Sequence, residues 1–215
     1  MKLPLTHIWL PAKTPSKRLV VVLHGLGDSA RGFLWLQDEL DIDSFDYLLL
    51  NAPEPYYTGY RWYDISEDPL SGVVRSRHIL SEVFAVTKQE GYLPEKTFLL
   101  GFSQGSLMTL EFGARHTDRL AGYIGISGYS IDPEAVLKEL NPAVNHGDWL
   151  ITHGTKDEIL PVVQTRAQMK ALRAGGFKMD YREYPKSHTV DFEQELPEIR
   201  NWIADRANSS PEGRG

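Results

Sequence analysis

The residues with the clearest potential for chemistry lie in segment 101–105, which reads Gly-Phe-Ser-Gln-Gly. This G-x-S-x-G pattern follows an apolar run at 97–100 and precedes a stretch with helical periodicity. A serine on a tight turn between a strand and a helix has its hydroxyl pushed outward, and flanking glycines avoid clashes in that turn. The start of the helix directs free N–H groups towards a developing oxyanion. We therefore predict that Ser103 is a nucleophile.

A serine hydroxyl is a weak nucleophile near neutral pH and needs a general base that is oriented by a third group. With serine, acid and histidine expected in that order along the chain, the candidate bases are His146, His153 and His188. His146 lies in a polar segment before a strand, and His153 ends an apolar run, so surface and structural roles are expected for them. His188 lies in a loop between the last predicted strand and the last predicted helix. We predict that His188 is the general base.

The acid that orients the base is expected in a loop at the carboxyl edge of the sheet. Asp157 follows a predicted strand through a glycine-containing turn, which delivers its carboxylate to this edge. Asp148 precedes that strand and Asp180 lies within another, so both are expected to point away. We predict that Asp157 is the third member of a Ser-His-Asp triad, although an Asp in such a turn can also be purely structural.

An oxyanion hole needs two backbone N–H groups aimed at one point. The residue after the nucleophile, Gln104, is expected to supply one, and a loop after an earlier strand the other. Segment 24–28, His-Gly-Leu-Gly-Asp, follows the first strong apolar run, which makes the Leu26 N–H the natural second donor. His24 is expected to support this loop by hydrogen bonds rather than act as a base. A simple glycine-rich turn before a helix is the alternative.

The elements that must position these residues follow a pattern of short apolar runs alternating with longer amphipathic stretches. This pattern is typical of an α/β protein with a mostly parallel sheet and helices on both faces. The predicted strands are 19–24, 47–51, 97–101, 122–127, 149–153 and, nearer an edge, 178–184. Helical spacing is found around 33–40, 73–86, 103–111, 162–174 and 192–203, with Pro197 in or near the first turns of the last helix.

The longest segment without periodicity, 52–72, is rich in Pro, Tyr and Gly. Long loops in compact domains are often functional, so we predict a binding loop here. Trp62 in this loop, together with Ile159 and Leu160 beside Asp157, is predicted to line the substrate site. A packing role is the alternative for Trp62.

The composition limits the classes of protein to consider. The chain has 215 residues, 41% hydrophobic and 24% charged, a formal net charge of −6 and no cysteine. One domain over residues 1–207 with a flexible tail at 208–215 is expected. The negative charge argues against nucleic-acid binding, and the lack of cysteine excludes disulfides and thiolate sites. With Pro4 and Pro11 interrupting its start and no long apolar run, the chain is expected to be cytoplasmic without membrane insertion. No metal or cofactor motif is found, so neither is predicted.

Several motifs taken together resemble a known family. They are LHGLGDS, RWYD, LLGFSQGSLM, HGTKDEILP and a late Ser-His pair, in that order from about residue 19 to residue 202. Together they are similar to the acyl-protein thioesterase and bacterial carboxylesterase group, the phospholipase/carboxylesterase family of α/β-hydrolases. The resemblance implies an α/β-hydrolase fold with Ser103, Asp157 and His188 as the triad. It also implies Leu26 and Gln104 as the oxyanion-hole residues.

The implied activity is hydrolysis of small-molecule carboxylic esters, and in some members of palmitoyl-protein thioesters or lysophospholipids, without a cofactor. Several members form homodimers, so a homodimer is expected. The chain departs from the family pattern in two places: Ser106 stands where glycine is usual, and Pro185-Lys186-Ser187 precedes His188 where glycines are usual. Neither change removes a catalytic group.

Other functions are compatible with the fold class. A non-catalytic binding module would not require Ser, Asp and His together. Dienelactone hydrolases and dehalogenases carry Cys or Asp at the position of Ser103, which argues against both. A peptidase stays open, and comparing rates on an ester and its matching amide would separate it from an esterase.

Overall fold

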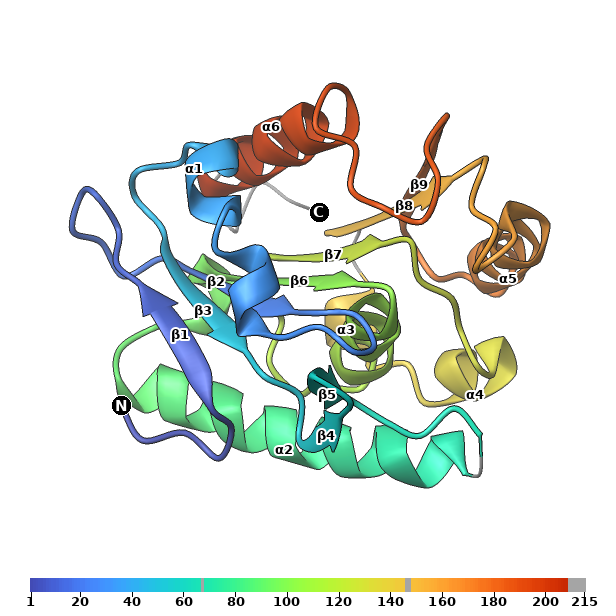
Figure 1. The fold of residues 1–215 in the computed structure, drawn as a ribbon, viewed down its shortest axis with the longest axis horizontal. Coiled ribbons are helices and arrows are strands. Elements are labelled where there is room, and N and C mark those ends of the chain that lie inside the picture. The colour runs from blue at the N-terminus through green and yellow to red at the C-terminus, as the bar shows by residue number, and fades with distance from the viewer. Residues whose placement is uncertain (67, 146–147, 209–215) are drawn as a thin grey trace.

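The computed structural model describes residues 1–66, 68–145 and 148–208. Within these residues the chain forms a seven-stranded sheet in the order β1-β3-β2-β6-β7-β8-β9 (Figure 1). β1 pairs antiparallel with β3, and the pairings from β3 across to β9 are parallel. The strands are β1 (His7–Leu10), β2 (Leu19–Leu23), β3 (Asp46–Leu50), β6 (Thr97–Phe102), β7 (Gly122–Ile126), β8 (Trp149–Gly154) and β9 (Asp180–Tyr184). The predicted α/β class with a mostly parallel sheet is confirmed.

Helices cover both faces of the sheet, as the sequence predicted (Figure 1). The helices are α1 (Leu36–Leu40), α2 (Pro69–Gln89), α3 (Gln104–Gly113), α4 (Pro133–Lys138), α5 (Val162–Ala174) and α6 (Glu195–Asn208). Strand β2 shows how the faces are divided, because Val21 packs in one hydrophobic cluster with residues of α2, α3 and α5, whereas Val20 packs with residues of α1 and α6. Both faces are buried, which explains the continuous apolar runs.

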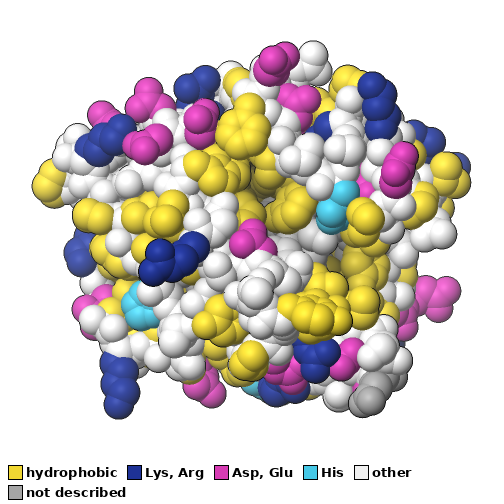
Figure 2. All heavy atoms as spheres, in the orientation of Figure 1, with side chains coloured by type: hydrophobic (Ala, Val, Ile, Leu, Met, Phe, Trp, Pro, Cys, Tyr) yellow, Lys and Arg dark blue, Asp and Glu magenta, His cyan; other side chains and the backbone are white. Residues whose placement is uncertain are grey.

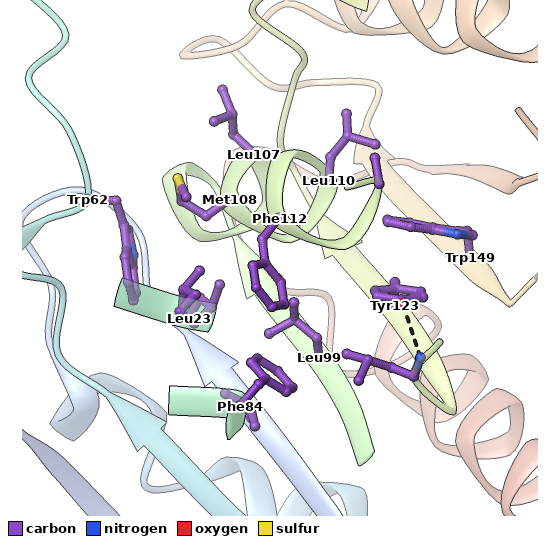
Figure 3. Packing of buried hydrophobic residues seen from close by; sticks show 14 of the residues in the cluster. Leu23, Trp62, Phe84, Leu99, Leu107, Met108, Leu110, Phe112, Tyr123 and Trp149 are labelled. Atoms are coloured by element: carbon purple, nitrogen blue, oxygen red, sulfur yellow. Dashed lines mark hydrogen bonds between the residues drawn. The ribbon is translucent and has the colours of Figure 1, made fainter. Parts of the chain in front are cut away.

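The core on one face is built around α3 (Figure 3). Every residue of α3 is buried, including Leu107, Leu110 and Phe112. At its C-terminal end the rings of Tyr123 and Trp149 stack with centroids 4.0 Å apart. This dense packing fixes α3 against the sheet, and so fixes the turn that precedes it.

The elements missed by the sequence analysis are short. β1 is a half-buried edge strand without clear alternation, and α4 spans only six residues. The segment predicted as an irregular loop contains a hairpin of β4 (Glu54–Tyr56) and β5 (Gly59–Arg61) and the first turn of α2. Three-residue strands give too few positions for a periodicity to emerge. In α6, Pro197 lies in the first turn, where its missing N–H costs no hydrogen bond, and Phe192 lies before the helix.

Two sequence expectations concern residues outside the described ones. His146 lies outside, as do residues 209–215 of the predicted tail at 208–215. Among the helices of the described residues, none has the length and apolar character needed to span a membrane.

Candidate active site

Ser103 lies at the turn between β6 and α3, at the carboxyl edge of the sheet. Its backbone adopts φ 54° and ψ −114°, a sparsely populated conformation for a residue with a side chain. Its N–H donates a hydrogen bond to the Ile126 carbonyl (2.9 Å), and its own carbonyl accepts one from the Leu107 N–H (3.1 Å). The strained turn is therefore held from β7 and from the first turn of α3.

The two glycines of the motif are required by close backbone contacts. A Cβ at Gly101 would lie 2.1 Å from the carbonyl oxygen of Gly105, and one at Gly105 would lie 2.0 Å from that of Leu23. Ser106, the departure from the family pattern, packs against Gly125 and Gly128 of the neighbouring strand and loop, where a Cβ would meet its hydroxyl at 2.6 and 2.2 Å. Because Gly125 and Gly128 carry no side chains, they leave room for Ser106.

The structure brings Ser103, His188 and Asp157 together in one hydrogen-bonded chain. His188 Nε2 lies 2.9 Å from Ser103 Oγ, and His188 Nδ1 lies 2.8 Å from Asp157 Oδ2. An ionised carboxylate can only accept, so Nδ1 carries the proton and Nε2 is left to accept from the serine hydroxyl. The His188 side chain is 17% exposed and that of Asp157 is fully buried, so solvent reaches the imidazole but not the carboxylate.

Asp157 is held by the backbone of its own loop, which connects β8 to α5. Its Oδ1 accepts hydrogen bonds from the N–H groups of Ile159 (3.0 Å) and Leu160 (2.8 Å), which leaves Oδ2 for His188. Burial alone would raise the pKa of the Asp157 carboxyl, but these bonds and the neighbouring histidine rings hold the pKa below its usual value. The carboxylate is therefore stably ionised and fixed in orientation.

His153, one of the alternative bases, lies behind this carboxylate rather than beside Ser103. Its Nε2 is 2.8 Å from the Leu160 carbonyl oxygen and 3.5 Å from Asp157 Oδ2. Burial lowers the pKa of its fully buried imidazole, which favours the neutral form. The expected structural role of a strand-end histidine fits these contacts. The alternative acids lie elsewhere, with Asp148 paired to Arg119 and Asp180 to Arg182.

The two predicted oxyanion donors belong to segments that lie next to Ser103. Gln104 is the first residue of α3, so no preceding helical turn supplies an acceptor for its N–H. Leu26 lies in a turn closed by a hydrogen bond from the Asp28 N–H to the Gly25 carbonyl (3.3 Å), which does not use the Leu26 N–H. A Cβ at Gly25 would lie 3.2 Å from Ser103 Cβ, so this turn lies directly against Ser103.

The side chain of His24 also holds this turn in place. Its Nδ1 lies 2.6 Å from the Gly25 carbonyl oxygen, and its Nε2 accepts a hydrogen bond from the Ala52 N–H (3.0 Å). Because Nε2 accepts, Nδ1 is the protonated nitrogen that donates to Gly25. Burial lowers the pKa of His24, which favours the neutral ring required by this pattern. The predicted structural role of His24 agrees with this geometry.

The β4–β5 hairpin braces the turn from the other side. The Gly27 N–H donates to the Tyr60 carbonyl, and the Tyr60 N–H donates to the Asp28 carbonyl, both at 2.9 Å. Gly59 lies so close that a Cβ there would be 2.2 Å from the Gly27 carbonyl oxygen. The predicted binding loop at 52–72 therefore pairs directly, through this hairpin, with the turn at 24–28 that carries Leu26.

The side chain of Gln104 makes long-range contacts beside the candidate site that the sequence does not predict. Its Nε2 donates to the Tyr63 carbonyl (3.0 Å) and its Oε1 accepts from the Trp62 N–H (3.0 Å). These bonds tie the segment after the hairpin to the start of α3. A glutamine within a helical pattern gives no signal of such a long-range contact.

The three predicted substrate-lining residues have different environments. Trp62 is fully buried in the core, and its indole N–H donates to the His24 carbonyl (2.9 Å), so it has the packing role given as its alternative. Ile159 is 69% exposed beside Asp157, and Leu160 is partly buried. Only the latter two present surface near the triad. The aromatic ring of Phe102 also borders it, with its centroid 5.1 Å from that of His188.

Apolar side chains gather on the face seen in Figure 2, around a hollow between the positions of α6 and α3 in Figure 1. No group of three or more His, Cys, Asp or Glu side chains in the described part of the chain is arranged to hold a metal ion.

Comparison with known proteins agrees with this architecture. Residues 8–206 match the family described as Phospholipase/Carboxylesterase. Acyl-protein thioesterase 1 of Yarrowia lipolytica is 26% identical over 220 residues, covering 93% of this chain and 96% of that protein. The protein of the same name from Debaryomyces hansenii is 28% identical over 225 residues, covering 94% and 97%. The crystal structure of esterase PE8 superposes with a TM-score of 0.81 at 27% identity, covering 94% of this chain and 98% of that one. This chain therefore belongs to the phospholipase/carboxylesterase family.

Proposed function

We propose that this protein is a serine carboxylesterase that hydrolyses carboxylic esters of small to medium apolar acyl groups through an acyl-enzyme. The observation that carries the proposal is the continuous hydrogen-bonded chain from Ser103 Oγ through His188 to Asp157. A nucleophile bonded to a base, which is bonded in turn to an orienting acid, is the arrangement that acyl transfer requires. Membership of the family supports the same reaction class.

In the first step, Ser103 Oγ attacks the ester carbonyl carbon while His188 Nε2 takes the hydroxyl proton. The negative charge that develops on the carbonyl oxygen is stabilised by the N–H groups of Leu26 and Gln104. Asp157 stays ionised and stabilises the imidazolium that has formed. When the tetrahedral intermediate collapses, the bond to the leaving oxygen breaks and His188 returns the proton to the departing alcohol.

In the second step, a water molecule enters as the alcohol leaves. His188 takes a proton from this water, whose oxygen attacks the acyl carbon of the Ser103 ester. The same two N–H groups stabilise the second oxyanion. Collapse of this intermediate releases the carboxylic acid, and the proton on His188 returns to Ser103 Oγ.

Two features favour an apolar acyl group. Ile159 presents exposed apolar surface next to Asp157, and the Phe102 ring packs beside His188. Rings continue outward from Phe102 through Phe33 and Trp35 to Phe192, with neighbouring centroids 4.8 to 6.5 Å apart. Burying apolar substrate surface against such side chains stabilises the complex.

Thioesters are the second candidate substrates, because relatives of this chain carry the name acyl-protein thioesterase. The same steps apply with a thiol as leaving group. A lysophospholipase or protein depalmitoylase is the corresponding alternative, and a non-catalytic binding module is the alternative of another class. The expected homodimer and cytoplasmic location stay predictions.

A fluorophosphonate reagent tests the proposal, because it phosphonylates only a serine activated as a nucleophile. We expect one reagent adduct per chain, located on the peptide that contains Ser103 by mass spectrometry and absent from His188→Gln. Rates on an acyl ester, its thioester and its amide then rank the leaving groups. A folded protein that leaves Ser103 unlabelled and turns over none of the three would contradict the proposal and favour a binding module.

A further inference from the structure

The loop that carries His188 contains a buried lysine, Lys186, whose side chain is 2% exposed. Its Nζ lies 2.6 Å from both carboxylate oxygens of Glu195 and 2.8 Å from the carbonyl oxygen of Thr189. Thr189 directly follows His188, so the lysine side chain bridges the two sides of the loop around that histidine. All three donor sites of the ammonium group therefore have partners at hydrogen-bond distance.

Glu195 connects this bridge to α6. It is the first residue of that helix, is fully buried, and its Oε2 also accepts a hydrogen bond from the Asp191 N–H (3.0 Å). A carboxylate at a helix N-terminus is favoured by the helix dipole. The ion pair thus links the histidine loop to an element that is packed firmly on the sheet.

The backbone of Lys186 contacts the loop that carries Asp157. The Lys156 N–H donates to the Lys186 carbonyl (3.0 Å), and a Cβ at Gly154 would lie 2.4 Å from that same oxygen. One residue therefore contacts the acid loop through its backbone and α6 through its side chain, with His188 two positions further on.

The pair is costly to bury, which argues that it has a specific role. Burial lowers the pKa of Lys186, and Glu195 opposes this shift. Two charges removed from water give little net stability compared with apolar residues of the same size. In addition, this segment, Pro185-Lys186-Ser187, is where the chain departs from the glycine-rich pattern that precedes the histidine in the family it resembles.

We infer that Lys186 and Glu195 form a clamp that positions the His188 imidazole between Asp157 and Ser103. Both are positioning residues, since neither contacts the reacting atoms. A loop with glycines at these positions has more backbone freedom. In this chain, the side-chain contacts between Lys186 and Glu195 restrict the loop instead. This inference rests on the proposed function, because it assigns the clamp to the general base of that reaction.

The double variant Lys186→Met/Glu195→Leu tests the clamp without leaving one charge buried alone. We expect a folded protein whose kcat on a short neutral ester falls by about 10- to 100-fold, because a displacement of about 1 Å in a catalytic group has that effect. KM should change little, since the substrate surface is intact. The matched control Arg119→Met/Asp148→Leu removes the ion pairs that Asp148 makes with Arg119 and Arg206 at the opposite edge of the sheet, and it should keep the wild-type kcat.

An NMR measurement reports on the clamp independently of turnover. The proton between His188 and Asp157 should give a separate low-field signal, identified by its absence from His188→Gln. We expect this signal to weaken or to exchange faster with water in the Lys186/Glu195 double variant and to persist in the control. If the double variant does not fold, Glu195→Gln keeps an acceptor for Lys186 while removing the charge, and a smaller loss of kcat is expected.

An unchanged kcat in the folded double variant or in Glu195→Gln would overturn the inference, as would an equal loss of kcat in the control. If the wild type itself hydrolyses no ester, the proposed function fails. The NMR signal then decides the clamp alone, and a signal unaffected by the double variant would overturn it.

Discussion

At the scale of single residues, each hydrogen bond of the site selects the protonation state of the next group. Asp157 accepts two backbone N–H bonds on one oxygen, so its other oxygen is directed at His188 Nδ1. That contact places the imidazole proton on Nδ1 and leaves Nε2 as the acceptor for Ser103. In the proposed mechanism, the reactivity of Ser103 therefore depends on a carboxylate that does not touch it.

Asp157→Asn tests this dependence. An amide at position 157 does not stabilise the imidazolium and favours the wrong tautomer, so we expect kcat to fall on the order of 10⁴-fold with a smaller change in KM. Steady-state hydrolysis of a neutral ester measures the effect. The control Asp180→Asn alters a carboxylate on β9 that is paired with Arg182, and it should keep the wild-type rate. Equal activity of both variants would remove Asp157 from the mechanism.

The lowered pKa of Asp157 also predicts how stability depends on pH. Its pKa in the folded protein lies below the ordinary value of 3.8, so the ionised group stabilises the fold above that pH. This contribution is lost as pH falls through the folded pKa. We expect urea unfolding to show a stability difference between wild type and Asp157→Asn that shrinks as pH is lowered below about 4. A difference that does not vary between pH 2.5 and 6 would contradict the assigned direction.

At the scale of elements, the β4–β5 hairpin has a role that its length does not suggest. It pairs with the turn at Gly27 and Asp28 and lies next to the segment that Gln104 holds. The position of the Leu26 N–H therefore depends on a hairpin from a different part of the chain. This segment stands out in the sequence by its lack of periodicity, but the contacts it makes follow from tertiary packing.

Gly59→Ala tests whether the β4–β5 hairpin positions the turn at Gly27 and Asp28. The added Cβ would meet the Gly27 carbonyl at 2.2 Å, so β5 must move away from the turn. If this misaligns the Leu26 donor, kcat should fall by about 10²- to 10³-fold, the usual effect of losing one oxyanion donor. Tyr57→Ala at the tip of the same hairpin is the control, because this side chain is 92% exposed. An unaffected kcat in a folded Gly59→Ala protein would separate the hairpin from catalysis.

At the scale of the whole molecule, the sequence predicts most of the fold because both faces of the sheet are buried. The apolar runs that include Val20, Leu99 and Ile151 are strands for that reason, and parallel topology brings the loops at their carboxyl ends to one edge. This edge is where the predicted Ser103, Asp157 and His188 lie within hydrogen-bond distance of one another.

What the sequence does not predict are contacts between distant segments that leave no spacing pattern. Trp62 was expected to line the site and is instead buried against His24, because tertiary packing rather than loop membership decides its environment. The Lys186–Glu195 pair is a similar case. A lysine in a polar loop is normally solvated, and only the structure shows it buried and paired with Glu195 at the start of α6.

The formal net charge of −6 predicts how kcat/KM for charged substrates depends on salt concentration. Like charges repel at long range, and salt screens the repulsion, since the Debye length falls from about 30 Å at 0.01 M to about 8 Å at 0.15 M. We expect kcat/KM for an anionic half-ester to rise a few-fold over this range, while the matched neutral ester shows no trend. A fall for the anionic ester would indicate a local cationic surface near the site instead.

Whether Ser103 is the nucleophile of an ester hydrolase is tested most directly by comparing wild type with Ser103→Ala on one short aryl ester. We expect turnover by the wild type and a loss of about 10⁴- to 10⁶-fold in kcat for the variant, because the proposed triad acts as a unit. Circular dichroism and urea unfolding establish that the variant is folded. Equal hydrolysis by both proteins would contradict the assignment of Ser103 and the mechanism built on it.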